Sequence, residues 1–188
     1  MSSSNHKPVT GIFLALISAI LWGMLPVALK ELLVVMDAVT IVWYRFLLAF
    51  VVLLLWLAHR KQLPNVRNVS NATRWILVVA SIMLCANYFM FNFSLNFVNG
   101  ETSEAVIQLS TLFLIIGGVV FYKEPFSRIQ IGGTLMIVVG LLLFFDDRLF
   151  GLANLDNTES IGVIVVVFAA ITWAIYALLQ KKLSRHYS

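Results

Sequence analysis

The sequence predicts an all-α fold, a polytopic bundle of transmembrane helices, and three observations carry this prediction. Of the 188 residues, 61% are hydrophobic and only 12% are charged, and the apolar residues gather in long stretches separated by short polar ones. A soluble domain has about 25% charged residues, so this chain could not cover its surface with polar groups in water. We therefore expect lipid to be its main solvent.

Six stretches qualify or nearly qualify as membrane-spanning helices, because a hydrocarbon core about 30 Å thick needs about 20 helical residues. They are Val9–Leu29, Ala38–Ala58, Trp75–Phe97, Ser103–Tyr122, Ile129–Phe145 and Ile161–Gln180. The first is too long for a removed signal peptide and has no evident cleavage site, so it is expected to be a true span. The short connections favour antiparallel neighbours in one compact bundle.

The charged residues separate onto two sides of the predicted membrane. One side holds Lys7, Arg60, Lys61, Arg67, Arg74, Lys123, Arg128, Lys181, Lys182 and Arg185. The other side holds only two basic residues, Lys30 and Arg148, together with all acidic residues except Glu124. An excess of Lys and Arg marks the cytoplasmic side of a membrane protein. We therefore predict an integral protein of the cytoplasmic (inner) membrane with its N-terminus in the cytoplasm.

The first and sixth spans resemble each other in sequence. At a constant offset of 151 residues, the identical pairs include Gly11 with Gly162, Trp22 with Trp173, and Lys30 with Lys181. The second copy lies five spans after the first, and five is an odd number, so the two copies are expected to cross the membrane in opposite directions. This pattern is typical of the inverted-topology repeats of many secondary transporters.

The repeat divides the chain into unequal parts. We predict a cytoplasmic tail over residues 1–8 and a first five-span transporter unit over residues 9–150. Residues 151–188 would hold a periplasmic or extracellular linker and the first span of a second unit. An inverted pair of units would need roughly 300 residues. The expectation is therefore an N-terminal part of a ten-span protein, with a complete six-span protein as the alternative.

Three segments carry a resemblance to a known family. Residues 121–144, FYKEPFSRIQIGGTLMIVVGLLLF, place Glu124 just after the fourth span and Gly132 and Gly140 in the fifth. The segments AILWGMLPVALK and YRFLLAF, from the first and second spans, add Trp22 and Arg45. In this order and spacing, from the first span into the sixth, the chain resembles the EamA-type drug/metabolite transporter family.

The resemblance implies a fold and a general activity. It implies ten spans in two inverted halves and a permease for small metabolites, without naming the substrate. One position departs from the family, because Leu109 and Ser110 are followed by Thr111 where the family often has proline. This departure weakens the expectation of a helix kink in the fourth span. In the first span, Pro26 either breaks the hydrogen-bond ladder or ends the helix.

Polar or small residues follow one face of three predicted spans. The third span carries Ser81, Cys85, Tyr88, Asn92, Asn96 and Asn99 at steps of three and four residues, the fourth carries Glu101, Glu104, Gln108 and Thr111, and the first carries Gly11, Ala15, Ser18, Trp22 and Pro26. Polar side chains facing lipid lose hydrogen bonds that nothing replaces. These faces should therefore turn to neighbouring helices, as hydrogen-bonding links, or to a wet cavity; both interpretations are open.

Arg45 is the only charged residue between Ala38 and Ala58. It lies about 11 Å inside the outer edge of the second span at 1.5 Å per residue. It could extend to the headgroups or make a structural pair. Alternatively, it could face a central cavity and bind an anionic group, or pair with Glu104. Glu104 is the candidate titratable coupling group, and an exposed carboxylate at a loop edge is its other interpretation.

The predicted substrate path consists of Trp22, Arg45, Tyr88, Asn92, Asn96, Gln108 and Thr111, with Glu104 for coupling. The function predicted is a secondary transporter, a permease or exporter, that moves small organic metabolites by alternating access. A non-transporting or truncated membrane subunit is the alternative. The expected partners are a small-molecule substrate and membrane lipid, a homodimer is left open, and nucleic acid is not expected.

An enzyme is not predicted. The sequence has no G-x-S-x-G motif, no H-E-x-x-H motif and no histidine within a predicted span, and it has no P-loop for ATP. The single cysteine, Cys85, excludes an internal disulfide and a cysteine-rich metal site. We therefore expect no metal and no cofactor.

Overall fold

The computed structural model of the protein describes residues 8–63, 69–145 and 158–187, and every regular element in these ranges is an α-helix. The helices are α1 (Pro8–Leu32), α2 (Ala38–His59), α3 (Asn71–Ser94), α4 (Gly100–Ile107), α5 (Leu109–Tyr122), α6 (Arg128–Phe145) and α8 (Thr158–Tyr187). With α4 and α5 taken together, six helical segments are long and apolar enough to cross a membrane. The predicted all-α bundle is confirmed.

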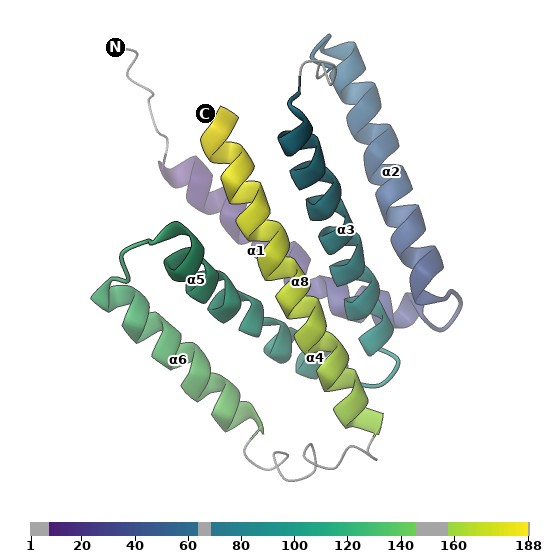
Figure 1. Ribbon diagram of the computed structural model, residues 1–188. Coiled ribbons are helices and arrows are strands. Elements are labelled where there is room, and N and C mark those ends of the chain that lie inside the picture. The colour runs from purple at the N-terminus through teal and green to yellow at the C-terminus, as the bar shows by residue number, and fades with distance from the viewer. Residues whose placement is uncertain (1–7, 64–68, 146–157, 188) are drawn as a thin grey trace.

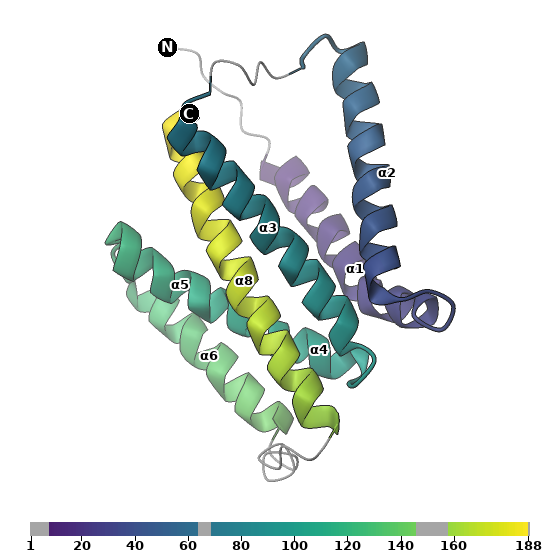
Figure 2. The same cartoon turned by 45° about the vertical axis from the view of Figure 1, so that its right-hand side comes forward.

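Helix α8 lies at the centre of the bundle. It packs along α3 and against α4 and α5, as both views show (Figures 1 and 2). Helix α1 begins, and α8 ends, at the same end of the molecule, so the two helices run in opposite directions (Figure 1). We call this end the terminal end and the other the distal end.

The domain boundaries that the sequence predicts, at residues 8 and 150, stay predictions. Residues 146–157 lie outside the described ranges.

Helix α1 continues past its internal proline. Pro26 lies inside the helix, which ends only at Leu32, so the interpretation that Pro26 ends it is wrong. Tertiary packing explains this, because Leu29, one turn later, is 1% exposed and holds the last turns against the core. The ring of Pro26 is also buried against Gly100, where an added Cβ would lie 3.1 Å from the Pro26 Cβ.

The fourth span is interrupted at Gln108 although no proline is present. Helix α4 ends at Ile107 and α5 begins at Leu109. Around the break the hydrogen bonds tighten to a spacing of three residues, from the Gln108 N–H to the Ala105 carbonyl and from the Thr111 N–H to the Gln108 carbonyl, at 3.3 and 3.0 Å. A short stretch of this tighter helix re-aims side chains in the middle of a span.

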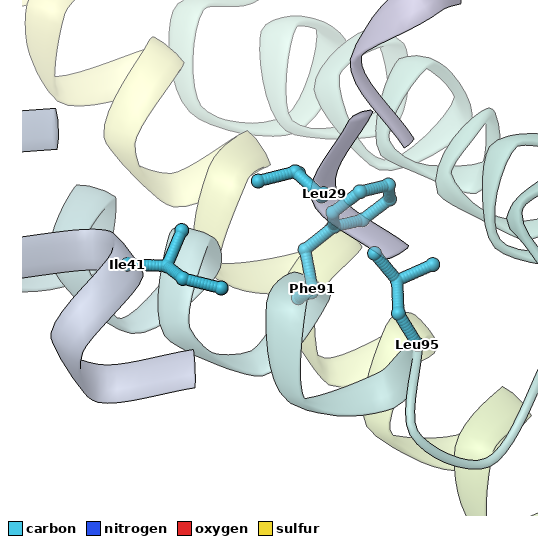
Figure 3. Packing of buried hydrophobic residues seen from close by; sticks show 5 residues of the cluster. Leu29, Ile41, Phe91 and Leu95 are labelled. Atoms are coloured by element: carbon cyan, nitrogen blue, oxygen red, sulfur yellow. The ribbon is translucent and has the colours of Figure 1, made fainter. Parts of the chain in front are cut away.

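The apolar core joins helices that are distant in sequence. Leu29, Ile41, Phe91 and Leu95 form one cluster with Ala169, so α1, α2, α3 and α8 meet there (Figure 3). A second cluster of Val106, Phe145 and Val166 joins α4, α6 and α8. Large apolar side chains otherwise cover the outside of the bundle, above all on α1, α2 and α6. Such a surface suits lipid rather than water.

Candidate functional site

A cavity of about 210 Å³ opens among the helices where the core clusters leave space. Its walls come from α1, α2, α3, α4, α5, α8 and the residue between α4 and α5. It is lined by six of the eight residues predicted for the substrate path and coupling: Trp22, Arg45, Tyr88, Glu104, Gln108 and Thr111. The structure therefore brings together residues spread over 90 positions of sequence, from 22 to 111. Their role in transport stays a prediction.

The cation of the cavity is Arg45. Its guanidinium carbon lies 4.8 Å from the centre of the Tyr88 ring, within the range of a cation–π contact. Its Nη1 atom is buried and has no hydrogen-bond partner among the described residues. The pairing of Arg45 with Glu104 that the sequence left open is not seen in the described part of the chain. A buried guanidinium nitrogen without an acceptor can receive a carboxylate or another anionic group.

The aromatic wall is held by packing between helices. The Tyr88 ring on α3 and the Phe46 ring on α2 meet edge to face, with ring centres 5.3 Å apart. Tyr88 is thereby fixed between Phe46 and Arg45. Trp22 of α1 and Trp173 of α8, which match each other in the sequence repeat, both line the same cavity. The site thus offers flat apolar surfaces beside one positive charge.

The break between α4 and α5 supplies the polar wall. Gln108 stands at the break, and Ser110 and Thr111 follow it in the first turn of α5. Glu104, one turn before the break, lines the cavity and also a second depression of about 490 Å³ at the distal end. Glu104 therefore adjoins both the cavity and that depression, and its coupling role stays a prediction.

Two predicted residues do not line the cavity. Asn92 is completely buried, and its side-chain nitrogen and oxygen have no hydrogen-bond partner among the described residues. Asn96 is exposed in the turn after α3 and donates to the Phe93 carbonyl. The reason for Asn96 is that α3 ends at Ser94, so helical spacing no longer governs its direction. Ser81 and Cys85, from the same predicted stripe, are exposed as well.

Sequence reasoning missed four polar or aromatic residues of the cavity, namely Asn87, Phe91, Ser110 and Trp173. Asn87 is buried, and its Nδ2 atom donates to the Ala169 carbonyl of α8 at 2.8 Å. The polar stripe predicted on the third span includes the neighbouring residue, Tyr88, and therefore leaves out Asn87. Trp173 had a usable signal, since the repeat matches it with Trp22. Among the described residues, no three His, Cys, Asp or Glu side chains gather as a metal site would require.

Comparison with known proteins gives one family. The model described as the EamA-like transporter family matches residues 9–146. A Haemophilus influenzae protein named an uncharacterized transporter is 41% identical over 98% of this chain, and the match covers 60% of that protein. An Escherichia coli K12 protein named uncharacterized inner membrane transporter YhbE is 40% identical over 93% of this chain and 55% of its own length.

A more distant relative is protein RarD of Salmonella typhi, which is 24% identical over 93% of this chain and 56% of its own length. This chain therefore spans between 55% and 60% of the length of the relatives described here. No solved structure matches it.

Proposed function

Because the chain belongs to the EamA-like transporter family, we propose that it is the larger part of a secondary transporter for small organic metabolites. In its described residues the chain has six helical segments long and apolar enough to cross a membrane, and its membership of a transporter family supports a transporter rather than an enzyme. The finer proposal is transport by alternating access across the inner membrane, with the N-terminus in the cytoplasm. The excess of Lys and Arg on the terminal side of the spans supports this orientation.

The observation that carries the proposal is the cavity with Arg45 in its wall. An ionisable side chain within a membrane span is expensive to insert and usually serves a functional site. Here its buried Nη1 atom has no acceptor among the described residues, so an acceptor on the substrate would satisfy it. We assign Arg45 the binding of an anionic group of the substrate.

The other walls suggest how the rest of the substrate is held. Trp22, Tyr88 and Trp173 would contact its apolar body. Gln108 and Thr111 would hydrogen-bond to its polar groups. Glu104 would couple transport to a proton, because it faces both the cavity and the distal depression.

Alternating access requires a second set of helices. The unmatched 40–45% of the relatives' length supports a second unit that continues from α8. The matched sequences and opposite directions of α1 and α8 support an inverted relation between the two units. Rocking of the two units about the cavity would expose it to each side of the membrane in turn.

The test replaces Arg45 in the full-length protein. Metabolites of cells with and without the wild-type protein are profiled first, and a metabolite whose distribution depends on the protein becomes the probe. For Arg45→Gln at normal abundance, we expect probe transport to fall by about 10- to 100-fold, because a hydrogen bond from a charged donor is lost. The matched control is Arg60→Gln, because Arg60 also lies over an aromatic ring, that of Trp56, but outside the cavity.

Each result has a clear meaning. Normal transport by Arg45→Gln at normal abundance would remove Arg45 from the binding site. An equal loss in Arg60→Gln would show that the effect is not specific to the cavity. Profiles that do not depend on the wild-type protein would favour the non-transporting subunit.

A further inference from the structure

A polar contact at the terminal end of the bundle joins the end of α5 to α8. The Lys181 ammonium donates to the Glu124 carboxylate at 2.6 Å. The Tyr122 hydroxyl donates to the Leu178 carbonyl, also at 2.6 Å. The Lys181 nitrogen lies 5.8 Å from the centre of the Tyr122 ring. We call these four residues the clasp.

The end of α5 is shaped to direct the clasp toward α8. Lys123 adopts a left-handed conformation with φ of 51°, and its N–H and that of Glu124 both bond to the Gly118 carbonyl. The chain thereby turns back on the helix and brings the Glu124 carboxylate over Gly118. A Cβ at position 118 would lie 3.0 Å from the Glu124 Oε2 atom, so a larger residue would crowd the carboxylate.

Between the cavity and the clasp, α5 and α8 are closed against each other. Gly117 and Gly118 follow the cavity residues Ser110 and Thr111 by seven residues, so they lie on the same face of α5 two turns later. Both glycines are buried, and a Cβ at position 117 would collide with the side chain of Leu178. The face of α5 that lines the cavity therefore continues into a closed seam, which the clasp fastens at its end.

The distal end of the cavity differs from its terminal end in what adjoins it. Glu104 belongs both to the cavity and to the distal depression, which is also lined by Pro26, Lys30 and Glu101. The cavity thus adjoins a depression on the distal side and a closed seam on the terminal side. In a protein whose cavity opens to each side in turn, the closed seam must separate before substrate can pass to the terminal side.

We propose that the clasp is the gate of the terminal side, with the Glu124–Lys181 ion pair as the contact that breaks on opening. This inference rests on the proposed function, because a gate presupposes alternating access. The two side chains are 30% and 38% exposed. Partly exposed ion pairs form and break at little cost, which suits a contact that must open repeatedly.

The sequence repeat assigns a counterpart on the opposite side. Lys181 matches Lys30 at the offset of 151 residues. Lys30 lies at the distal end, where it donates to the Val98 carbonyl at 3.2 Å and makes no ion pair with a described side chain. In the full-length transporter, Lys30 takes the place of Lys181 in a distal gate, with an acidic residue of the second unit as its partner.

The experiment measures access to the cavity from each side. In the full-length protein with Cys85→Ala, a reporter cysteine is placed in the cavity by Thr111→Cys. Its reaction with a charged, membrane-impermeant methanethiosulfonate is timed in vesicles of both orientations. We expect Lys181→Gln to speed the reaction from the terminal side by about two- to fivefold. The loss of a partly exposed ion pair would increase the population of the state that is open to that side by this factor.

Two variants test whether the ion pair itself is responsible. Lys182→Gln removes the next charge along α8, which is exposed and outside the clasp, and should leave the reaction rate unchanged. The charge-exchanged double variant Glu124→Lys with Lys181→Glu should return the rate toward that of the parent. An unchanged rate in Lys181→Gln, or an equal rise in Lys182→Gln, would overturn the gate.

Failure of the gate can be told apart from failure of the proposed function. Transport of a metabolite probe with no change of access in Lys181→Gln leaves the transporter standing and removes the gate. A change of access in a protein that transports nothing removes the transporter and leaves a conformational contact that opens. If all clasp variants lose membrane abundance while Lys182→Gln does not, the clasp is a structural brace and the gate is refuted.

Discussion

Helices α1 and α8 match each other at an offset of 151 residues, yet their surroundings differ. Four apolar positions of α8 are at most 3% exposed, namely Val166, Ala169, Ala170 and Ala174. The matching positions of α1 are all exposed, namely Ala15, Ser18, Ala19 and Gly23. Helix α8 has α3, α4 and α5 around it, whereas α1 packs chiefly through its last turns.

The same pattern of small residues is therefore packed against other helices in α8 and left exposed in α1. Small residues on one face let two helices approach closely, and this is how membrane helices associate without a hydrophobic driving force. Helix α8 uses its small face, and α1 carries an equivalent face without a partner among the described helices. The comparison can be tested by substitutions at matching positions.

The largest effect is expected at the glycine pair. At Gly162 an added Cβ would lie 2.8 Å from the Phe97 Cβ and 2.7 Å from the Val98 Cγ1. At Gly11 nothing lies within 4 Å. Gly162→Leu should therefore lower the free energy of unfolding of this chain by about 1–3 kcal/mol. Gly11→Leu should leave it unchanged or raise it by about 0.5–1 kcal/mol, because leucine favours helix.

The measurement is unfolding of the chain in detergent, followed by circular dichroism. Equal losses in the two variants would contradict the difference in packing between α1 and α8. The same pair in the full-length protein sharpens the comparison. There, a loss in Gly11→Leu would show that further helices cover the small face of α1.

A smaller effect is expected at the hydrogen bond between α3 and α8. Asn87→Ala removes the donor to the Ala169 carbonyl and should cost about 0.5–1.5 kcal/mol of unfolding free energy. The matching position of Ala169 in α1 is Ser18, whose hydroxyl donates within its own helix to the Leu14 carbonyl at 2.9 Å. Ser18→Ala should therefore change stability by less than about 0.5 kcal/mol. Unfolding curves that do not distinguish the two variants would show that this interhelical bond adds no stability.

The spans could be predicted from the sequence because membrane thickness and apolar length determine them. Their ends could not be predicted as well, because capping and turns act locally. Helix α3 begins at Asn71, four residues before the predicted Trp75, since the Ser70 hydroxyl accepts from the Thr73 N–H and starts the helix among polar residues. The break at Gln108 also escaped prediction, because no proline marks it in the sequence.

The cavity was predictable where a polar residue was alone on an apolar helix. Arg45 stood out in this way, whereas Glu104 stood out as a member of a polar stripe, and both line the cavity. The rotation of α3 could not be predicted, because the contact with α8 decides which of its polar residues point inward. That contact buries Asn87 and leaves Cys85 exposed, although they lie only two residues apart.

The smallest effect is expected at the connection between α1 and α2, where a local contact acts with little tertiary packing. Asp37 caps α2 and accepts from the Thr40 hydroxyl at 2.6 Å and from the Thr40 N–H at 3.1 Å. These bonds, the hydroxyl's first, hold the pKa of Asp37 below its usual value of 3.8. A lowered carboxyl pKa adds stability above the pKa of the unfolded chain, and this stability disappears as the pH falls through the lower folded pKa.

Asp37→Asn keeps an acceptor oxygen at the cap but loses the charge. At neutral pH its unfolding midpoint should lie slightly below that of the wild type, by less than the shift in Asn87→Ala, because Asp37 is fully exposed and water screens its contacts. As the pH falls below 3.8, the two midpoints should converge. A difference that persists at about pH 2 would assign the effect to side-chain shape rather than charge. A difference larger than that in Asn87→Ala would mean that local capping stabilises this part of the bundle more than contact with α8 does.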